Sequence, residues 1–225
     1  MPSLKNLTIA AKLYAAFAFM LVLLIGVALF AWTRLRTVQD DSHTISTNWL
    51  PAVSAAHAME TDLANYRIGL LQMVTSRNPD KTKAAEDAMT AAGQAFKGHA
   101  TAYEKLVSSE RERELYQRFS TAWKSYYTHT LTIAGHMRDS NYDDAVRLQN
   151  GDARKAYEES SRLAAELVAL NERGAGESAA NADDTYASAV RLLLLVAVLA
   201  AVAAAVMAVT LVRAVTRPLA RAVRA

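Results

Sequence analysis

The chain has no cysteine, and only four prolines and eight glycines occur among its 225 residues. Without cysteine it forms no disulfide and offers no thiol nucleophile, which fits an exported domain that folds without cross-links. The glycines form no phosphate-binding loop, and no serine stands in a G-x-S-x-G setting. The closest histidines, His129 and His136, are seven residues apart, about 10 Å along a helix and too far to share one zinc ion. We therefore predict no enzyme, no metal and no cofactor.

Charge is absent from two long apolar runs, residues 13–32 and 192–212. They hold 20 and 21 residues, so each would span about 30 Å as a helix, the thickness of a bilayer's hydrocarbon core. A cleaved signal peptide is the alternative for the first run, but its apolar core is long and only a weak Gly26-x-Ala28 offers a cleavage site. We predict two transmembrane helices, with residues 33–191 as one extramembrane domain between them.

Acidic residues are absent from both ends of the chain. Residues 1–12 carry two lysines and residues 213–225 carry four arginines. Removing these six from the 25 basic residues leaves 19 against 22 acids, a net charge of about −3 for the middle. Basic flanks stay in the cytoplasm under the positive-inside rule, so we predict that both termini are cytoplasmic. The basic tails would lie beside membrane lipid, and we predict no nucleic-acid partner.

Apolar residues after residue 33 recur at alternating spacings of three and four, which indicates a long helix packed lengthwise against others. One series comprises Leu35, Ser42, Trp49, Ala56, Leu63 and Leu70, and the other comprises Val38, Ile45, Ala52, Met59, Tyr66 and Met73. This helix is predicted over 33–77. Pro51 should bend it or break a hydrogen bond, and Asn78-Pro79-Asp80 should end it.

A second helix is predicted over 80–107, and a third begins at a capping box formed by Ser109 and Glu112. After a turn at 139–142 we predict a short helical piece, and the last long helix begins at about residue 152. The expected core faces of the two long ones comprise Leu115, Phe119, Ala122, Tyr126, His129 and Ile133, then Ala156, Ser160, Leu163, Leu167 and Leu170. No stretch alternates with period two for long, so strands are not expected. The predicted fold class is all-α, an up-down-up-down four-helix bundle whose first and last helices continue into the two transmembrane helices.

Three segments carry a family resemblance: Asn6-Leu7-Thr8-Ile9 through Lys12-Leu13 with Phe17, the Arg67 region, and Val215-Thr216-Arg217-Pro218-Leu219. With the order of helices, they resemble the N-terminal half of bacterial methyl-accepting chemotaxis proteins, those with the four-helix-bundle ligand domain of the aspartate and serine receptors. The resemblance implies an inner-membrane homodimer with a periplasmic sensory domain. Residues 213–225 would begin a truncated HAMP linker, and downstream signalling partners would bind only a missing C-terminal part.

The resemblance also implies a small anionic ligand, an organic acid or amino acid, held near the membrane-distal end by first-helix arginines and groups near the start of the fourth helix. Arg67 matches by position, because it lies ten residues, about 15 Å, from the distal loop. An arginine fork suits a carboxylate. The predicted ligand-binding residues at this depth are Tyr66, Arg67, Tyr126, His129, Thr130, Asn150 and Arg154.

The function that the sequence favours is the sensory input module of a chemotaxis receptor, which passes a helix shift of about an ångström or two through the second membrane helix to a HAMP linker. The sensory half of a HAMP-linked histidine kinase or cyclase is an alternative. Another is a membrane-anchored scaffold bundle without a signalling role. At Arg67 itself, the alternative to a ligand contact is a solvated or salt-bridged arginine.

Overall fold

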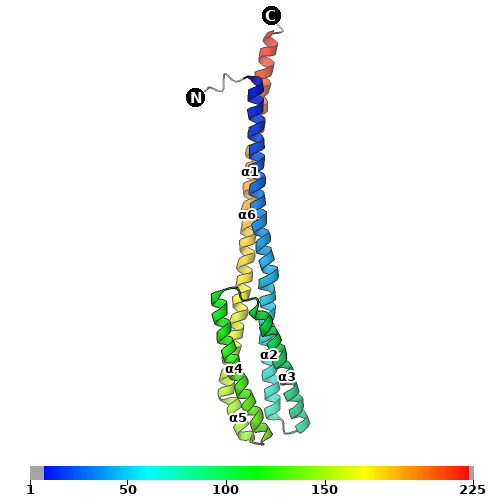
Figure 1. The fold of residues 1–225 in the computed structure, drawn as a ribbon, viewed down its shortest axis with the longest axis vertical. Coiled ribbons are helices and arrows are strands. Elements are labelled where there is room, and N and C mark those ends of the chain that lie inside the picture. Colours follow the sequence, from blue (N-terminus) through cyan, green and yellow to red (C-terminus); the bar gives the residue numbers. More distant parts are fainter. Residues whose placement is uncertain (1–7, 223–225) are drawn as a thin grey trace. The chain divides into compact units, whose positions relative to one another are not determined.

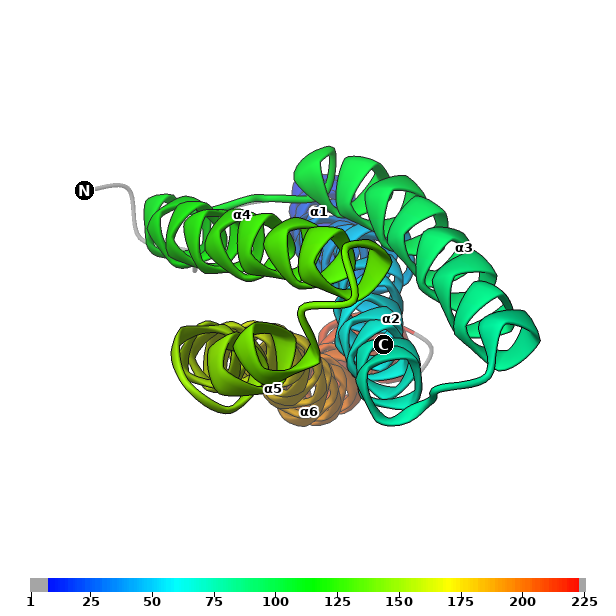
Figure 2. The same ribbon diagram turned by 90° about the horizontal axis from the view of Figure 1, so that it is seen from below.

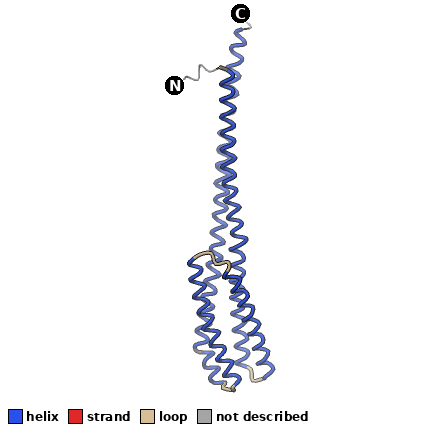
Figure 3. Tube along the Cα trace, viewed as in Figure 1, coloured by secondary structure: helices blue, strands red, loops and turns tan. Residues whose placement is uncertain are grey.

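The computed structural model describes residues 8–222, so Lys5, Asn6, Leu7 and Arg224 lie outside the described residues. Helices make up nearly all of this range, joined by short loops and without strands (Figures 1 and 3). In chain order they are α1 (Ile9–Thr44), the π-helical segment η2 (Ile45–Trp49), α2 (Leu50–Thr75), α3 (Pro79–Glu104), α4 (Glu110–Arg138), α5 (Tyr142–Asn150) and α6 (Asp152–Ala222). The predicted all-α class is confirmed.

The predicted helix boundaries follow from capping side chains. The Asn78 side chain accepts hydrogen bonds from the N–H groups of Asp80 and Lys81, at 2.9 and 3.2 Å, and Pro79 occupies the first helical position, which needs no donor. Ser109 Oγ accepts from the N–H of Glu112 at 3.2 Å, so the predicted cap of α4 is confirmed.

Pro51 disturbs the first long helix, as predicted. Proline has no N–H, so the carbonyl oxygen four residues earlier loses its helical donor. The chain adapts in η2, just before the proline, where the Leu50 N–H bonds to the Ile45 carbonyl five residues back rather than four. The helix predicted over 33–77 is therefore two α-helices with a π-helical segment between them.

Two compact units divide the chain: His43–Ala179, called the bundle below, and the helix pair formed by the segments before and after it. The bundle's helices are α2, α3, α4 and a fourth built from α5 and the first part of α6. In the view from below, α2 lies between α3 and α4 (Figure 2). The predicted core positions from Ala52 onwards on α2 are buried, as are Leu115, Phe119, Tyr126 and Ile133 of α4 and Ser160, Leu163 and Leu167 of α6. The four-helix bundle is thus confirmed.

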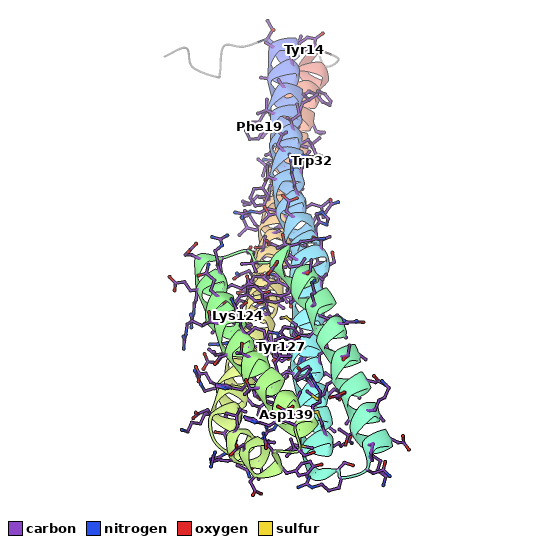
Figure 4. The ribbon with its side chains drawn as sticks, turned by 60° about the horizontal axis from the view of Figure 1, so that its bottom comes forward. Tyr14, Phe19, Trp32, Lys124, Tyr127 and Asp139 are labelled. Atoms are coloured by element: carbon purple, nitrogen blue, oxygen red, sulfur yellow. The ribbon has the colours of Figure 1, made fainter. Side chains whose placement is uncertain are left out.

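The helix pair is apolar and exposed. Tyr14, Phe19 and Trp32 project outward from α1 (Figure 4), with 75, 55 and 67% of each residue exposed. Leu35, the first member of the heptad series, is also exposed, so that series forms a core only within the bundle. α1 and α6 each hold a segment long and apolar enough to cross a membrane, and none of either segment is buried. Such surfaces favour lipid as their surroundings.

Candidate functional site

Arg67 of α2 places its guanidinium inside the bundle. Its Nη1 atom is buried and has no hydrogen-bond partner among residues 8–222. Its guanidinium carbon lies 5.2 Å from the centre of the Tyr157 ring on α6, a cation–π contact. Arg67 forms no ion pair with any described carboxylate, whereas most other bundle arginines do. A partly buried charge without a counter-charge is costly, so this position favours an anion.

Tyr126 of α4 lies beside Arg67. Its hydroxyl is buried and, like Arg67 Nη1, has no partner of good hydrogen-bond geometry among the described residues. Burial raises the pKa of Tyr126, and the charge of Arg67 and a hydrogen-bonding interaction with its guanidinium oppose part of that rise. The phenol therefore stays protonated and can donate a hydrogen bond. Arg67 and Tyr126 together present unused donors inside the bundle.

Tyr66 and Thr130 join α2 to α4 next to this pair. Their hydroxyl oxygens are 3.0 Å apart, and the Thr130 hydroxyl donates to the Tyr127 carbonyl at 2.7 Å, so Tyr66 must be the donor between them. Burial raises the pKa of Tyr66, which keeps it protonated. The ring of Tyr66 packs edge-on against Tyr126, with centroids 6.0 Å apart. We call Tyr66, Arg67, Tyr126, Thr130 and Tyr157 the Arg67 cluster.

The structure brings together four of the seven predicted site residues and leaves three outside. His129 is half-buried on α4. Arg154 is exposed and donates to the Asn150 carbonyl and to Glu158, both at 3.2 Å. Asn150 is exposed too. These two therefore meet each other on the solvent face rather than joining the Arg67 cluster.

Tyr157 was missed by the sequence analysis. The only signal for it was its place directly after the predicted core residue Ala156. The other distal arginine, Arg77, is already engaged, because its guanidinium carbon lies 4.0 Å from the Tyr142 ring centre and its Nη1 donates to the Val74 carbonyl at 3.0 Å. Arg67, by contrast, keeps a buried Nη1 atom without a hydrogen-bond partner among the described residues.

A second buried polar group provides a contrast. The carboxylate of Glu112 accepts from the Tyr103 hydroxyl at 2.8 Å and from the N–H of Ser108 at 2.8 Å. The Asn171 amide donates to the same Tyr103 hydroxyl at 2.7 Å and to the Leu167 carbonyl at 2.9 Å, and only its Oδ1 atom lacks a partner. We call Tyr103, Ser108, Glu112 and Asn171 the Glu112 network. Its charge is matched by donors from the protein itself.

A groove of about 770 Å³ opens between α3 and α4. Tyr66 and Met73 of α2 line it, together with Thr130 of α4. Tyr66 and Thr130 thus belong both to the Arg67 cluster and to the groove, whereas Arg67 does not line the groove. The Arg67 cluster and the groove are therefore two polar regions of the bundle that have Tyr66 and Thr130 in common.

Comparison with known proteins places this geometry in a family. No curated protein matches the sequence. A solved structure, the periplasmic sensor domain of a sensor histidine kinase, resembles this chain with a TM-score of 0.54 at 18% identity. The alignment covers 62% of this chain and 93% of that one, and at this identity it shows the fold. The family model of the four-helix-bundle sensory module for signal transduction matches residues 6–186, and the chain belongs to that family.

Proposed function

We propose that this chain is a membrane-anchored sensory input module that binds a small organic anion through Arg67. One observation carries the proposal: inside the bundle, Arg67 has a buried donor without a partner and no carboxylate to neutralise it. A carboxylate ligand would supply both, because it accepts two parallel hydrogen bonds from one guanidinium. Organic acids and amino acids are the ligand classes that fit.

The remaining members of the Arg67 cluster would complete the site. The Tyr126 hydroxyl, buried and unpartnered, would donate to the ligand anion. The Tyr157 ring would keep the guanidinium in place by the cation–π contact. Since Arg67, Tyr126 and Tyr157 lie on α2, α4 and α6, the ligand would tie three helices of the bundle together.

Transmission would run along α6, which is one continuous helix from Asp152 to Ala222. Ligand binding can favour one of two packings of the bundle only by the difference in its affinity for them. An anion that ties Arg67, Tyr126 and Tyr157 together would favour one packing of α6 against α2 and α4, and α6 would carry the resulting shift through its apolar part. A HAMP linker is our proposal for the segment 213–225 that receives it.

The apolar helix pair supports a topology with two membrane spans. Under the positive-inside rule the basic tails are cytoplasmic, so we propose that the bundle is periplasmic and the chain lies in the inner membrane of a bacterium. The similar solved domain is titled periplasmic, which agrees with this orientation. A chemotaxis receptor is our preferred whole protein. A histidine kinase is the second candidate, because the similar domain comes from one.

A homodimer remains our proposal for the assembly. The heptad residues of α2 are used inside the bundle, so they are not free to pair two copies. Exposed apolar residues remain on the same helix at Leu50, Ile68 and Leu71. A partner copy would cover this side of α2. Chemical cross-linking between cysteines introduced at Ile68 would test it.

A thermal-shift screen of the full chain in lipid nanodiscs tests the ligand proposal. Dicarboxylates and amino acids should include a compound that raises the melting temperature by mass action. The shift should disappear in Arg67→Met and persist in Arg154→Ala, which removes an exposed arginine. A hit that persists in Arg67→Met would refute the assignment of Arg67. A folded protein that responds to no compound would favour the scaffold alternative.

A further inference from the structure

The groove between α3 and α4 has the size of a small-molecule site. Its volume of about 770 Å³ lies within the range of about 300–1,000 Å³ that is common for such sites. On its α2 side, α3 packs closely on α2. Gly69 of α2 permits this, since a Cβ there would lie 2.6 Å from Met89 Cγ and 3.3 Å from the Ala85 carbonyl oxygen, both on α3.

Aromatic rings form the apolar part of the groove. Phe96 of α3 stacks on Trp123 of α4, with ring centroids 4.1 Å apart and an interplanar angle of 28°. Tyr127, labelled in Figure 4, follows on α4 with its ring 6.0 Å from Trp123, and 40% of the residue is exposed. These three residues line the groove. Flat rings of this kind favour a planar, conjugated ligand that stacks against them.

The charged residues of the groove indicate which charge a ligand would carry. Glu86 of α3 pairs with Arg138 of α4 at 3.8 Å. Glu104 accepts a hydrogen bond from the Tyr116 hydroxyl at 2.9 Å. Lys97 lines the groove between them on α3, and it has no ion-pair partner among residues 8–222. Glu104 has no cationic partner either, but its carboxylate is hydrogen-bonded by Tyr116, whereas the Lys97 ammonium has neither an ion pair nor a hydrogen bond among the described residues. The Lys97 ammonium is therefore the group of the groove that is available to a negative group of a ligand.

The geometry points to a second binding site in the α3–α4 groove, for a planar aromatic molecule that carries one anionic group. Its ring would stack beside Trp123 and Tyr127, and its anion would bind Lys97. This site is separate from the Arg67 cluster and does not depend on the function proposed for it. The two share only Tyr66 and Thr130, whose hydroxyls are hydrogen-bonded at 3.0 Å. A molecule in the groove would therefore contact two residues that also belong to the Arg67 cluster.

Calorimetric titration of the full chain in nanodiscs tests the site, with naphthoate as the probe and empty nanodiscs as the reference. Naphthamide has the ring without the charge, and acetate has the charge without the ring. Naphthoate should bind, and the other two should bind at least about fivefold more weakly, since each loses one of the two contacts. Failure of naphthoate to bind, or equal binding of naphthamide, would overturn the proposal.

Variants locate the bound probe. Lys97→Gln should weaken binding about fivefold or more, and Lys97→Arg should restore it. The control Lys124→Gln removes an exposed lysine that projects away from the groove (Figure 4) and should change nothing. Ser120→Phe places a ring in the groove and should abolish binding, with circular dichroism to verify the fold.

Arg67→Met should bind the probe as the unchanged protein does. Loss of binding in Arg67→Met alone would move the probe to the Arg67 cluster and overturn the groove site.

Discussion

Among the buried polar groups of the bundle, the Glu112 network and the Arg67 cluster differ in how far the protein satisfies them. In the Glu112 network, the completely buried carboxylate accepts hydrogen bonds from the Tyr103 hydroxyl and from the Ser108 N–H. In the Arg67 cluster, Arg67 Nη1 and the Tyr126 hydroxyl are buried without partners. Burial of a polar group costs free energy unless a hydrogen bond replaces the lost water. We therefore assign a structural role to the hydrogen-bonded carboxylate of Glu112, and we propose that the unsatisfied donors of the Arg67 cluster serve a ligand.

The position of the two groups agrees with these roles. Glu112 lies in the first turn of α4, where the helix dipole also favours a negative charge. Through Tyr103 and Asn171 its network joins α3, α4 and α6 where the α3–α4 loop begins. The Arg67 cluster joins α2, α4 and α6 instead, through the Tyr66–Thr130 hydrogen bond, a cation–π contact and ring packing, and the Arg67 charge has no carboxylate partner among the described residues. We expect the first to resist change and the second to respond to it.

Glu112→Ala should have the largest effect on stability. The substitution leaves the Tyr103 hydroxyl and the Ser108 N–H without an acceptor, and we expect a loss of about 3 kcal/mol in the free energy of unfolding. Urea titration followed by far-UV circular dichroism would measure it. Glu114→Ala, an exposed glutamate on the same helix, serves as the control and should stay within about 0.5 kcal/mol. Equal effects of the two substitutions would contradict a structural role for the Glu112 network.

A pair of tyrosine substitutions compares the two groups directly. Tyr103→Phe removes a hydroxyl with two hydrogen-bond partners and should cost about 2 kcal/mol. Tyr126→Phe removes a hydroxyl that has no partner of good hydrogen-bond geometry among the described residues and should change stability by no more than about 0.5 kcal/mol, because no well-formed hydrogen bond is lost. The same urea titration measures both. A comparable loss in Tyr126→Phe would mean that its hydroxyl is hydrogen-bonded in solution, and the contrast would fail.

The sequence predicted the parts of this comparison that local rules determine. Heptad spacing predicted the buried face of α2, Asn78-Pro79-Asp80 predicted the end of that helix, and Ser109 predicted the start of α4, because these signals act within a few residues. Counting along helices at about 1.5 Å per residue placed Tyr66, Arg67, Tyr126 and Thr130 at one depth. This count fixes height along the bundle but not rotation about each helix axis.

Rotation and spacing between helices account for what the sequence did not reveal. Arg154 was expected beside Arg67, but α6 turns it to solvent and presents Tyr157 to the Arg67 guanidinium instead. The α3–α4 groove has no sequence signature, since the spacing between helices, such as the close approach of α3 to α2 at Gly69, is set by tertiary packing. Whether Arg67 has an acid partner also depends on tertiary packing, and only the structure could distinguish an unpaired arginine from a salt-bridged one.

Arg67→Met should have a small effect on stability, with the opposite sign to that of Glu112→Ala. Methionine keeps an unbranched apolar stem beside Tyr157 and removes the unmatched charge, so the ligand-free protein should gain up to about 1 kcal/mol. Arg154→Ala removes an exposed ion pair and should fall within about 0.5 kcal/mol of the unchanged protein. A loss above about 2 kcal/mol in Arg67→Met would show that the arginine stabilises the fold. A gain in the free energy of unfolding would show that Arg67 destabilises the ligand-free bundle. Such a cost would support a role of Arg67 in binding an anion.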